Sequence, residues 1–527
     1  MSQRAGHDGD VITRLVWIQG TQLSLRNSAL AAADREQDRV VLIESLPQVL
    51  RGRLHRHKVT LVLAAMRRFA EELRADGWQV DEFRLELELG FAHALKRAVT
   101  THAASEVLVM ELPGWQAQAN LPRLAEAIGC PIQTTLDSHF LCGREQFADW
   151  AGMRRRLRMQ DFYAWMRREH DVLLDDGEPC GGKWSFDHDN RETFAAWRRS
   201  DERARPTPPP PIDHNDAVLA AVQADIDRHA PGLPGRAEDF WLPTTRAESL
   251  RWLADFVEQR LATFGPFEDV SDPDDPWLRH ATLSPLLNIG LLEPRECVAA
   301  AEAAYRAGAA PLASVEGFIR QVLGWREYVN GVYWREMPGY AALNELDAHA
   351  PVPPALTGEA KTDLACVQHV ADTVERYAWA HHIDRLMIAG NLMLLLGTEP
   401  QAANAWFRER FADGYDWVMQ ANVTGMSLHA DGGLMATKPY AAGGAYLKRM
   451  TGHCSGCRFD PRKRTGDDAC PFTTLYWDFT ARHHARLAAN PRTSQAARGW
   501  ERFAAEEQAL IRARAATVAE AISTGTL

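Results

Sequence analysis

The sequence predicts two architectures in one chain: an α/β N-terminal domain with a parallel, Rossmann-like sheet, followed by a large all-α domain. Over about the first 140 residues, strand patterns alternate with helical ones, which is typical of parallel strands joined by crossover helices. Beyond about residue 240, nearly every segment has the apolar spacing of a helix. A proline-rich stretch separates the two parts.

The N-terminal elements follow from the hydrophobic pattern in chain order. The predicted strands are 13–17, 39–44, 81–87 and 107–111. The predicted helices between them are 57–76, which ends at Gly77, and 90–101. This order of elements favours a parallel sheet.

The linker and the helical part complete the organisation. Pro206 to Pro211 contains five prolines in six residues, so we expect a stiff, extended connector there. The predicted domains are 1–145 (α/β), 146–240 (connector) and 241–527 (all-helical). The predicted helices of the last part are 246–263, 294–307, 314–335, 361–395, 400–412 and 498–522.

Composition limits the classes of protein that this chain can represent. Hydrophobic residues make up 46% and charged residues 24%, as in ordinary soluble proteins, and Leu392 to Leu396 is too short an apolar run to span a bilayer. Met1 to Asp10 has no apolar stretch of a secretion signal, and the scattered cysteines fit a reducing compartment, so we expect a cytoplasmic protein. A net charge of −11 argues against a globally basic nucleic-acid binder but allows a local basic groove.

Three closely spaced cysteines are the strongest chemical signal in the chain. Cys454 and Cys457 stand three residues apart, and Cys470 follows after a polar, charged loop. Thiolates at this spacing are typical of ligands to zinc or to an iron–sulfur cluster, and spacing alone leaves the two alternatives open. The fourth ligand is expected from Cys366, with His453 as the second choice.

Four further segments of the helical part together outline one large ligand site. The turn 279–290 opens a helix at Ser284 and suits a phosphate, although most Ser-Pro turns are only N-caps. The segment 318–328 mixes aromatic residues with arginine, which is more often core plus a salt bridge. The segment 380–387 places His381, His382 and an acid in an apolar helix, where one histidine satisfied by Asp384 is the plain alternative. The segment 422–440 is a loop rich in small residues.

Taken in order, these motifs resemble a known family. Leu-Ser-Pro-Leu-Leu-Asn-x-Gly-Leu-Leu, Trp-Arg-Glu-Tyr, His-His-Ile-x-Arg-Leu-Met, Asn-Val-x-Gly-Met-Ser with Lys-Pro-Tyr, and Cys-x2-Cys-x12-Cys-Pro-Phe are similar to the photolyase/cryptochrome superfamily. More narrowly, they resemble its bacterial iron–sulfur branch, the deoxyribodipyrimidine photolyase-related proteins, which include prokaryotic (6-4) photolyases. The resemblance runs from about residue 13 to the end of the chain.

The resemblance implies three cofactors. A [4Fe–4S] cluster would be held by Cys366, Cys454, Cys457 and Cys470, which favours iron over zinc. FAD would lie in the helical domain, contacted by Ser284, Gln321, Trp325, Arg326, Arg385, Asn422 and Trp406. A lumazine antenna, 6,7-dimethyl-8-ribityllumazine, would lie in the α/β domain near Gln22 and Glu44.

The resemblance also implies the activity and the partner. The expected function is light-driven repair of (6-4) photoproducts by electron transfer from reduced FAD, with His382, assisted by His381, as the proton donor. The expected partner is UV-damaged DNA, bound by a monomer through Arg191, Lys438, Tyr440 and Tyr446, with arginine-rich runs at 154–168 and 458–464 as further phosphate contacts. The alternatives are a cryptochrome-like blue-light photoreceptor with little repair activity and, more distantly, a zinc-binding nucleic-acid scaffold without flavin.

The chain departs from the family pattern in its electron relay. Trp406 matches the relay member beside the flavin, but the next position is Phe407, which is hard to oxidise, and the outer tryptophan is replaced by Leu356. The sequence therefore predicts slow photoreduction of the flavin. The candidates to replace the missing members are Trp379, Tyr415 and Trp417.

Overall fold

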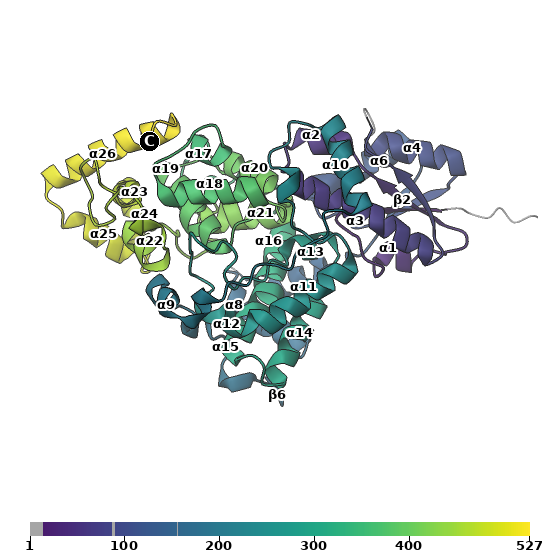
Figure 1. Ribbon diagram of the computed structural model, residues 1–527, viewed down its shortest axis with the longest axis horizontal. Helices are drawn as coiled ribbons and strands as arrows, with labels where there is room; N and C mark the ends of the chain where they lie inside the picture. The colour runs from purple at the N-terminus through teal and green to yellow at the C-terminus, as the bar shows by residue number, and fades with distance from the viewer. Residues whose placement is uncertain (1–13, 87–89, 155) are drawn as a thin grey trace, which may run out of the picture.

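A five-stranded parallel sheet forms one end of the molecule in this computed structural model, which describes residues 14–86, 90–154 and 156–527 (Figure 1). The strand order is β3-β2-β1-β4-β5. The strands are β1 Arg14–Ile18, β2 Arg39–Ile43, β3 Gln79–Phe83, β4 Glu106–Met110 and β5 Ile132–Thr135. Leu15 pairs with Arg39 on one side and with Val107 on the other. The parallel sheet is confirmed, and β5 is a strand that the hydrophobic pattern did not reveal. Thr13 and Leu87, at the ends of two predicted strands, lie outside the described residues.

Helices cover both faces of this sheet, because its strands are buried on both sides. Val16, Val40 and Leu42 share a core with α3 (Arg56–Ala75). The alternate residues Leu15, Trp17 and Val41 share a second core with α4 (Phe91–His102) and α6 (Leu121–Ile128). The remaining helices of this part are α1 Ser28–Ala31, α2 Leu46–Arg51 and α5 Trp115–Ala119.

The rest of the chain is almost entirely helical, as predicted (Figure 1). Its helices are α7 Arg144–Ala151, α8 Met159–Glu169, α9 Phe194–Arg199, α10 Ala217–His229, α11 Arg246–Gln259, α12 Leu261–Phe267, α13 Ser284–Ile289, α14 Pro294–Arg306, α15 Leu312–Ile319, α16 Glu327–Glu336, α17 Pro354–Thr357, α18 Ala365–Tyr377, α19 Asn391–Leu396, α20 Pro400–Arg410, α21 Asp416–Met419, α22 Gly444–Met450, α23 Pro471–Arg482, α24 His484–Ala489, α25 Ser494–Glu501 and α26 Ala505–Ser523. A short hairpin of β6 (Leu174–Asp175) and β7 (Glu178–Pro179) interrupts them. The domain boundaries at 145 and 240 stay a prediction.

Three predicted helices are divided in the structure. The segment 246–263 breaks at Arg260 into α11 and α12, and 498–522 is formed by α25 and α26. The segment 361–395 was predicted as one helix, and this is wrong: Ala378 adopts a left-handed conformation with φ 53°, which ends α18. His381 therefore precedes the next helix instead of lying within one, and His382 is its first helical residue.

The sheet domain is fixed to the helical part by polar groups of α3. Lys58 is buried and its Nζ donates to the backbone oxygens of Arg408, at 3.0 Å, and of Gly414. The connector returns to the same helix, where Arg56 of α3 forms an ion pair with Asp227 of α10 at 2.6 Å. Within the described ranges, no helix is both long and apolar enough to span a membrane.

Candidate functional site

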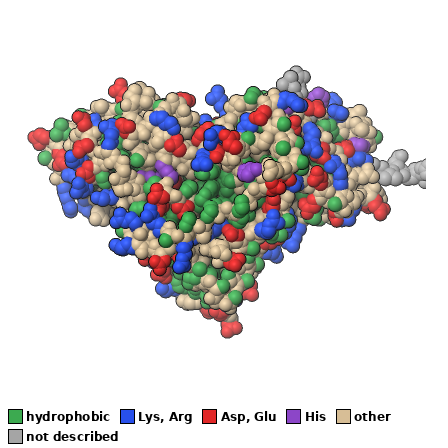
Figure 2. Space-filling view, in the orientation of Figure 1, with side chains coloured by type: hydrophobic (Ala, Val, Ile, Leu, Met, Phe, Trp, Pro, Cys, Tyr) green, Lys and Arg blue, Asp and Glu red, His purple; other side chains and the backbone are tan. Residues whose placement is uncertain are grey.

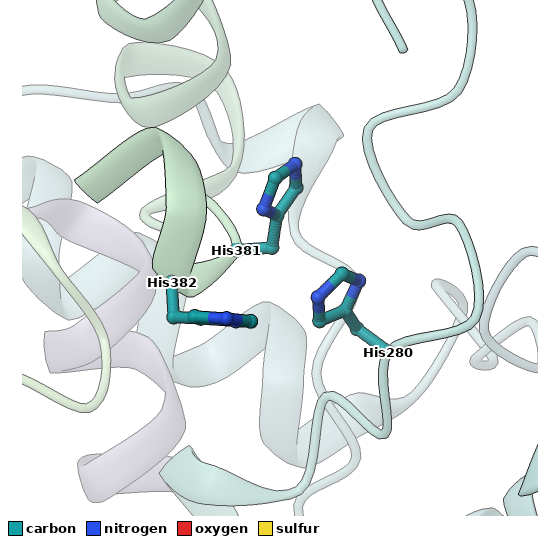
Figure 3. Close-up of side chains that lie close together, drawn as sticks. All are labelled: His280, His381 and His382. Carbon is teal, nitrogen blue, oxygen red and sulfur yellow. The ribbon is translucent and has the colours of Figure 1, made fainter. Parts of the chain in front are cut away.

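Three histidines from two separate segments meet at the break after α18. The ligand nitrogens of His280, His381 and His382 all lie within 4.8 Å of one another, and their rings face a common space (Figure 3). His280 comes from the loop before α13, and its ring stacks on His381 with centroids 4.6 Å apart. The chain break at Ala378 positions this group, because it turns His381 and His382 towards the loop.

The three rings differ in their protonation. Burial lowers the pKa of His280 to about 3 and holds the pKa of His381 well below its usual value, so both are neutral at pH 7. Desolvation also acts to lower the pKa of His382, but the hydrogen bond from its Nε2 to Asp269, at 3.2 Å, and the charge of that carboxylate outweigh it and raise the pKa. The His382 side chain is 50% exposed. His382 is therefore the imidazole of this group suited to hold and deliver a proton.

Buried acids lie behind the histidines. The Asp384 carboxylate approaches His381 Nε2 at 3.3 Å, and burial raises the pKa of Asp384 to about 7. Burial also raises the pKa of Glu268 to about 7, an effect that Arg320 partly offsets. His381 Nδ1 has no hydrogen-bond partner among the described residues, whereas both ring nitrogens of His280 lie beside backbone carbonyls at 3.2–3.3 Å. The buried Nδ1 of His381 is therefore a nitrogen of this group with unused hydrogen-bonding capacity.

Arg385 and Ser284, both predicted to contact FAD, are brought together by Asp413. Arg385 Nη1 binds the Asp413 carboxylate at 2.8 Å, and the Ser284 hydroxyl donates to the same carboxylate at 2.6 Å. Asn288, one turn along α13, donates to the Asp413 carbonyl at 3.0 Å. Sequence reasoning missed Asp413, although the Phe-Ala-Asp-Gly turn that carries it was a visible signal.

Three π-helical segments carry most of the other residues predicted to contact FAD. They are Arg320–Arg326, with Gln321, Trp325 and Arg326; Asp384–Gly390, with Arg385; and Gln420–Ser427, with Asn422. No other π-helical segment occurs in the described part of the chain. Because π-helical turns are costly and often mark functional sites, their coincidence with these residues indicates one binding region.

The side chains in these segments make contacts that hold the region in shape. The Arg326 guanidinium binds Glu327 at 2.7 Å and lies 4.1 Å from the ring centre of Phe140. Asn422 donates to the Val418 carbonyl at 2.9 Å. Trp406, on α20, donates its indole N–H to the Leu356 carbonyl at 2.9 Å, and its ring packs against Phe407 with centroids 4.7 Å apart.

The four predicted thiols come together at the start of α18 and α23. Cys366 lies in the first turn of α18, and Cys470 is the residue before α23. Burial raises the pKa of Cys366, and the neighbouring thiols Cys470, Cys454 and Cys457 raise it further, so all four are within electrostatic reach. His453 instead points its Nε2 to the Ser271 hydroxyl at 3.2 Å. The structure thus favours Cys366 over His453 as the fourth member.

The two residues predicted to contact the antenna lie at the carboxyl edge of the sheet, where α/β domains bind ligands. Gln22 is buried and donates to the Glu111 carbonyl at 2.9 Å, whereas its Oε1 has no partner among the described residues. Glu44, directly after β2, forms a buried ion pair with Arg67 at 2.7 Å and accepts from the Leu85 N–H. Gln22 has free hydrogen-bonding capacity, and Glu44 is occupied within the protein.

Comparison with known proteins identifies the chain. The family described as deoxyribodipyrimidine photo-lyase-related protein matches residues 16–242. A protein of Agrobacterium fabrum named (6-4) photolyase is 39% identical over 513 residues, which cover 96% of this chain and 99% of that relative. This chain belongs to the photolyase/cryptochrome superfamily. Membership in this family implies FAD as a cofactor.

Solved structures agree with this photolyase fold. A bacterial class III photolyase from Agrobacterium tumefaciens superposes with a TM-score of 0.56 at 16% identity, covering 97% of this chain and 98% of its own. A cryptochrome from Synechocystis sp. PCC6803 gives 0.54 at 14% identity, covering 95% and 93%. At such low identity these likenesses show the fold alone.

Two of the residues predicted to contact DNA, Tyr440 and Tyr446, lie within electrostatic reach of Asp269, the carboxylate bound to His382. The charges of Arg191 and Asp269 both act on the phenols of Tyr440 and Tyr446, and burial raises the pKa of Tyr446 to about 12. Arg191 pairs with Asp187, which also binds Arg320 at 2.9 Å. Lys438 is half-buried nearby, and desolvation lowers its pKa, as the charges of Arg492 and Arg191 also do.

The contribution of the two predicted basic runs to DNA binding stays a prediction, and Arg154, Arg156, Arg158 and Arg168 of the first run are exposed. Arg167 is buried and donates to the Val172 and Leu173 carbonyls, so it does not face DNA, and Arg155 lies outside the described residues. The second run is ion-paired through Arg458, Arg462, Lys463 and Arg464. A basic surface that the sequence did not reveal lies where α9 packs on α22 (Figure 2), with the exposed side chains Arg198, Arg199, Lys448 and Arg449.

We expect Asp269→Asn to lower the pKa of His382, because the substitution removes the carboxylate that raises it. With a lower pKa, His382 loses its proton at a lower pH than in the wild type. Repair of damaged DNA, measured against pH with chemically reduced flavin, should decline at a lower pH than in the wild type. Asp274→Asn, an exposed acid of the same loop, is the control. Unchanged profiles in both variants would contradict the assignment of His382 as the acid.

We expect Glu44→Gln to destabilise the sheet domain by about 3 kcal/mol, because it leaves the buried Arg67 guanidinium with Asp225 as its remaining partner. Chemical unfolding monitored by circular dichroism measures this change, and Glu36→Gln, an exposed glutamate, is the matched control. An altered antenna absorbance at unchanged stability would show instead that Glu44 serves the ligand.

Proposed function

We propose that this chain is a light-driven DNA-repair enzyme that acts on (6-4) photoproducts by electron transfer from reduced FAD. The observation that carries the proposal is the half-exposed His382, whose Nε2 lies 3.2 Å from Asp269, a carboxylate whose charge also acts on Tyr440 and Tyr446. A (6-4) product requires an acid during oxygen transfer, and an imidazole with a pKa near neutrality suits that step. The name of the 39%-identical relative from Agrobacterium supports the same activity.

The residues present fit FAD. Ser427 Oγ, Arg326 Nε and Tyr415 Oη are buried and have no hydrogen-bond partner among the described residues, and they lie in or next to the π-helical segments. We infer that Gln321, Trp325, Arg326, Arg385 and Asn422 hold the flavin, with Ser284 and Trp406 at its margins. Once bound, FAD supplies the light-driven electron that splits the lesion.

The protein's own part in the reaction is to orient, protonate and exclude water. A damaged base must leave the duplex to reach the site, and the half-buried Tyr440 and Tyr446 offer aromatic surfaces for it. His382 delivers the proton from its exposed edge. His381 is neutral and lies 3.3 Å from the Asp384 carboxylate, and burial raises the pKa of Asp384 and of Glu268 to about 7, so both acids are partly protonated at neutral pH.

The thiol group supports a [4Fe–4S] cluster rather than zinc. Among the described residues, one group of three potential metal ligands has all its ligand atoms within 4.8 Å of one another, and it consists of the three histidines. The four sulfurs do not form such a group, so they are spaced more widely. Four sulfurs on one zinc ion, each at about 2.3 Å from the metal, would lie closer together than this. A four-iron cluster separates its thiolates more widely, in line with the arrangement of Cys366, Cys454, Cys457 and Cys470.

We assign the antenna, 6,7-dimethyl-8-ribityllumazine, to the carboxyl edge of the sheet, where Gln22 Oε1 is buried without a partner among the described residues. UV-damaged DNA binds beside His382 through Arg191, Lys438, Tyr440 and Tyr446, and the protein acts as a cytoplasmic monomer. The second candidate function is blue-light signalling of the cryptochrome kind, favoured by Phe407 next to Trp406, a departure from the electron relay of the family.

Repair of a synthetic oligonucleotide carrying one (6-4) photoproduct, under blue light and with chemically reduced flavin, tests the proposed function. We expect restored thymines in the wild type and a loss of about 100-fold or more in His382→Ala, because general acid catalysis contributes about this much. His349→Ala, an exposed histidine outside the group, is the matched control. Bound FAD without repair in the wild type would instead establish the photoreceptor.

We expect Cys470→Ala to abolish the cluster, because three thiolates remain. Iron content per chain and absorbance near 400 nm measure the loss. Cys297→Ala removes a buried thiol on α14, away from the group, and should keep full iron content. Zinc in stoichiometric amount in the wild type, with no iron, would contradict the cluster.

A further inference from the structure

A ladder of tryptophans connects the half-exposed surface to the histidine group, and it does not include the relay residues expected from the family. Trp379, in the break after α18, has its ring centre 6.3 Å from those of His280 and His381. Trp277 lies 4.9 Å from Trp379, and Trp241 lies 4.4 Å from Trp277. Trp252 stacks on Trp241 at 5.5 Å with an interplanar angle of 25°.

The inner end of the ladder is fixed to the region assigned to the flavin. The carbonyl of Ala380, next to Trp379, accepts from Arg385 Nε at 2.6 Å. The carbonyl of Ala378, on its other side, accepts from the Ala412 N–H, next to Asp413, at 2.9 Å. Trp379 is 3% exposed, so its indole is shielded from water at the point where the chain passes Arg385 and Asp413.

The outer end is accessible and electronically suited to hold a positive charge. Trp241 and Trp277 are half-buried. The Trp241 indole N–H donates to the Tyr377 carbonyl at 2.8 Å, and the stacked Trp241–Trp252 pair spreads a positive charge over two rings. Tyr377 lies 5.0 Å from Trp277, but the Arg376 guanidinium 4.9 Å from its ring disfavours its oxidation.

The expected relay ends, by contrast, at rings that are hard to oxidise. In the part of the chain that the structure describes, the aromatic neighbours of Trp406 are Phe407, at 4.7 Å, and Phe411, at 5.5 Å. Its indole N–H is bound to the carbonyl of Leu356, the position where the outer tryptophan is absent. Within the described residues, Trp406 therefore has no second tryptophan in ring contact that could take up a positive charge.

We propose that electrons enter the flavin of this protein through Trp379, Trp277 and the Trp241–Trp252 pair. The inference rests on the proposed flavoprotein function. Trp379 gives one electron to the light-excited, oxidised flavin and becomes a radical cation. Trp277 then reduces Trp379, and Trp241 in turn reduces Trp277. An external thiol gives one electron to the outer pair, loses a proton to water, and ends as a thiyl radical. Through this ladder we expect photoreduction at an ordinary rate, in contrast to the slow photoreduction that Phe407 and Leu356 alone predict.

Time-resolved absorption of the tryptophan radical in the flavin-loaded protein tests the ladder. We expect Trp277→Phe to shorten the life of the radical and to slow photoreduction by about tenfold or more, because it removes the step that separates the charges. Trp165→Phe removes an indole that is likewise half-buried and stacked, at 6.2 Å on Trp150, and should leave both within about twofold. Full photoreduction in Trp277→Phe, with its loss in Trp406→Phe, would overturn the proposal.

Two further measurements separate failure of the ladder from failure of the proposed function. Near-ultraviolet circular dichroism should show an exciton signal from the closely spaced indoles. Trp277→Phe should reduce this signal, and the measurement does not depend on enzyme activity. Repair with chemically reduced flavin should be at the wild-type level in Trp277→Phe, because that assay does not use the ladder. Absence of repair in the wild type, together with ladder-dependent photoreduction, would reject the repair function and retain the ladder.

Discussion

The left-handed turn at Ala378 is the constraint on which the functional part of this protein depends. It ends α18, so that a helix carrying Cys366 in its first turn stops where Trp379, His381, His382 and Arg385 begin. A non-glycine residue in this conformation costs about 1–2 kcal/mol. Two tertiary hydrogen bonds offset that cost: the Ala378 carbonyl accepts from Ala412, and the Ala380 carbonyl accepts from Arg385. The same two bonds place Asp413 beside Arg385.

Differences in burial then give the titratable groups around this turn different pKa values. His280 and His381 are neutral because they are buried, whereas His382 is half-exposed and faces Asp269. Burial raises the pKa of Asp384 and of Glu268 to about 7, so these two acids behind the rings are only partly ionised at neutral pH. Three acids and three histidines thus leave one imidazole, His382, suited to hold a proton, and its partner Asp269 also acts through its charge on Tyr440 and Tyr446. Ser271, which binds His453 and lies beside Asp384, places the thiol loop next to the same group.

The sequence predicted what depends on local pattern and left out what depends on tertiary contacts. The first four strands follow from short apolar runs, and the cysteine spacing led to a group of thiols that the structure brings together. The break at Ala378 could not be predicted, because alanine favours helix and the bonds that stabilise the turn come from Ala412 and Arg385. Asp413 was missed for the same reason: its role appears only when Ser284 and Arg385 converge on it. The basic surface of α9 and α22 joins segments about 250 residues apart in the chain, so no linear charge run reveals it.

In the tryptophan ladder that we propose, other residues carry the physical function of the family's missing relay positions. Electron transfer requires oxidisable rings at close spacing between flavin and solvent, and it does not require a particular helix to carry them. Phe407 and Leu356 remove that property from α20 and α17, whereas Trp241, Trp252, Trp277 and Trp379 supply it from α11, two loops and the break after α18. The turn at Ala378 fixes both Trp379, the proposed point of electron entry, and His382, the proposed proton donor. The positions of these two residues are therefore coupled.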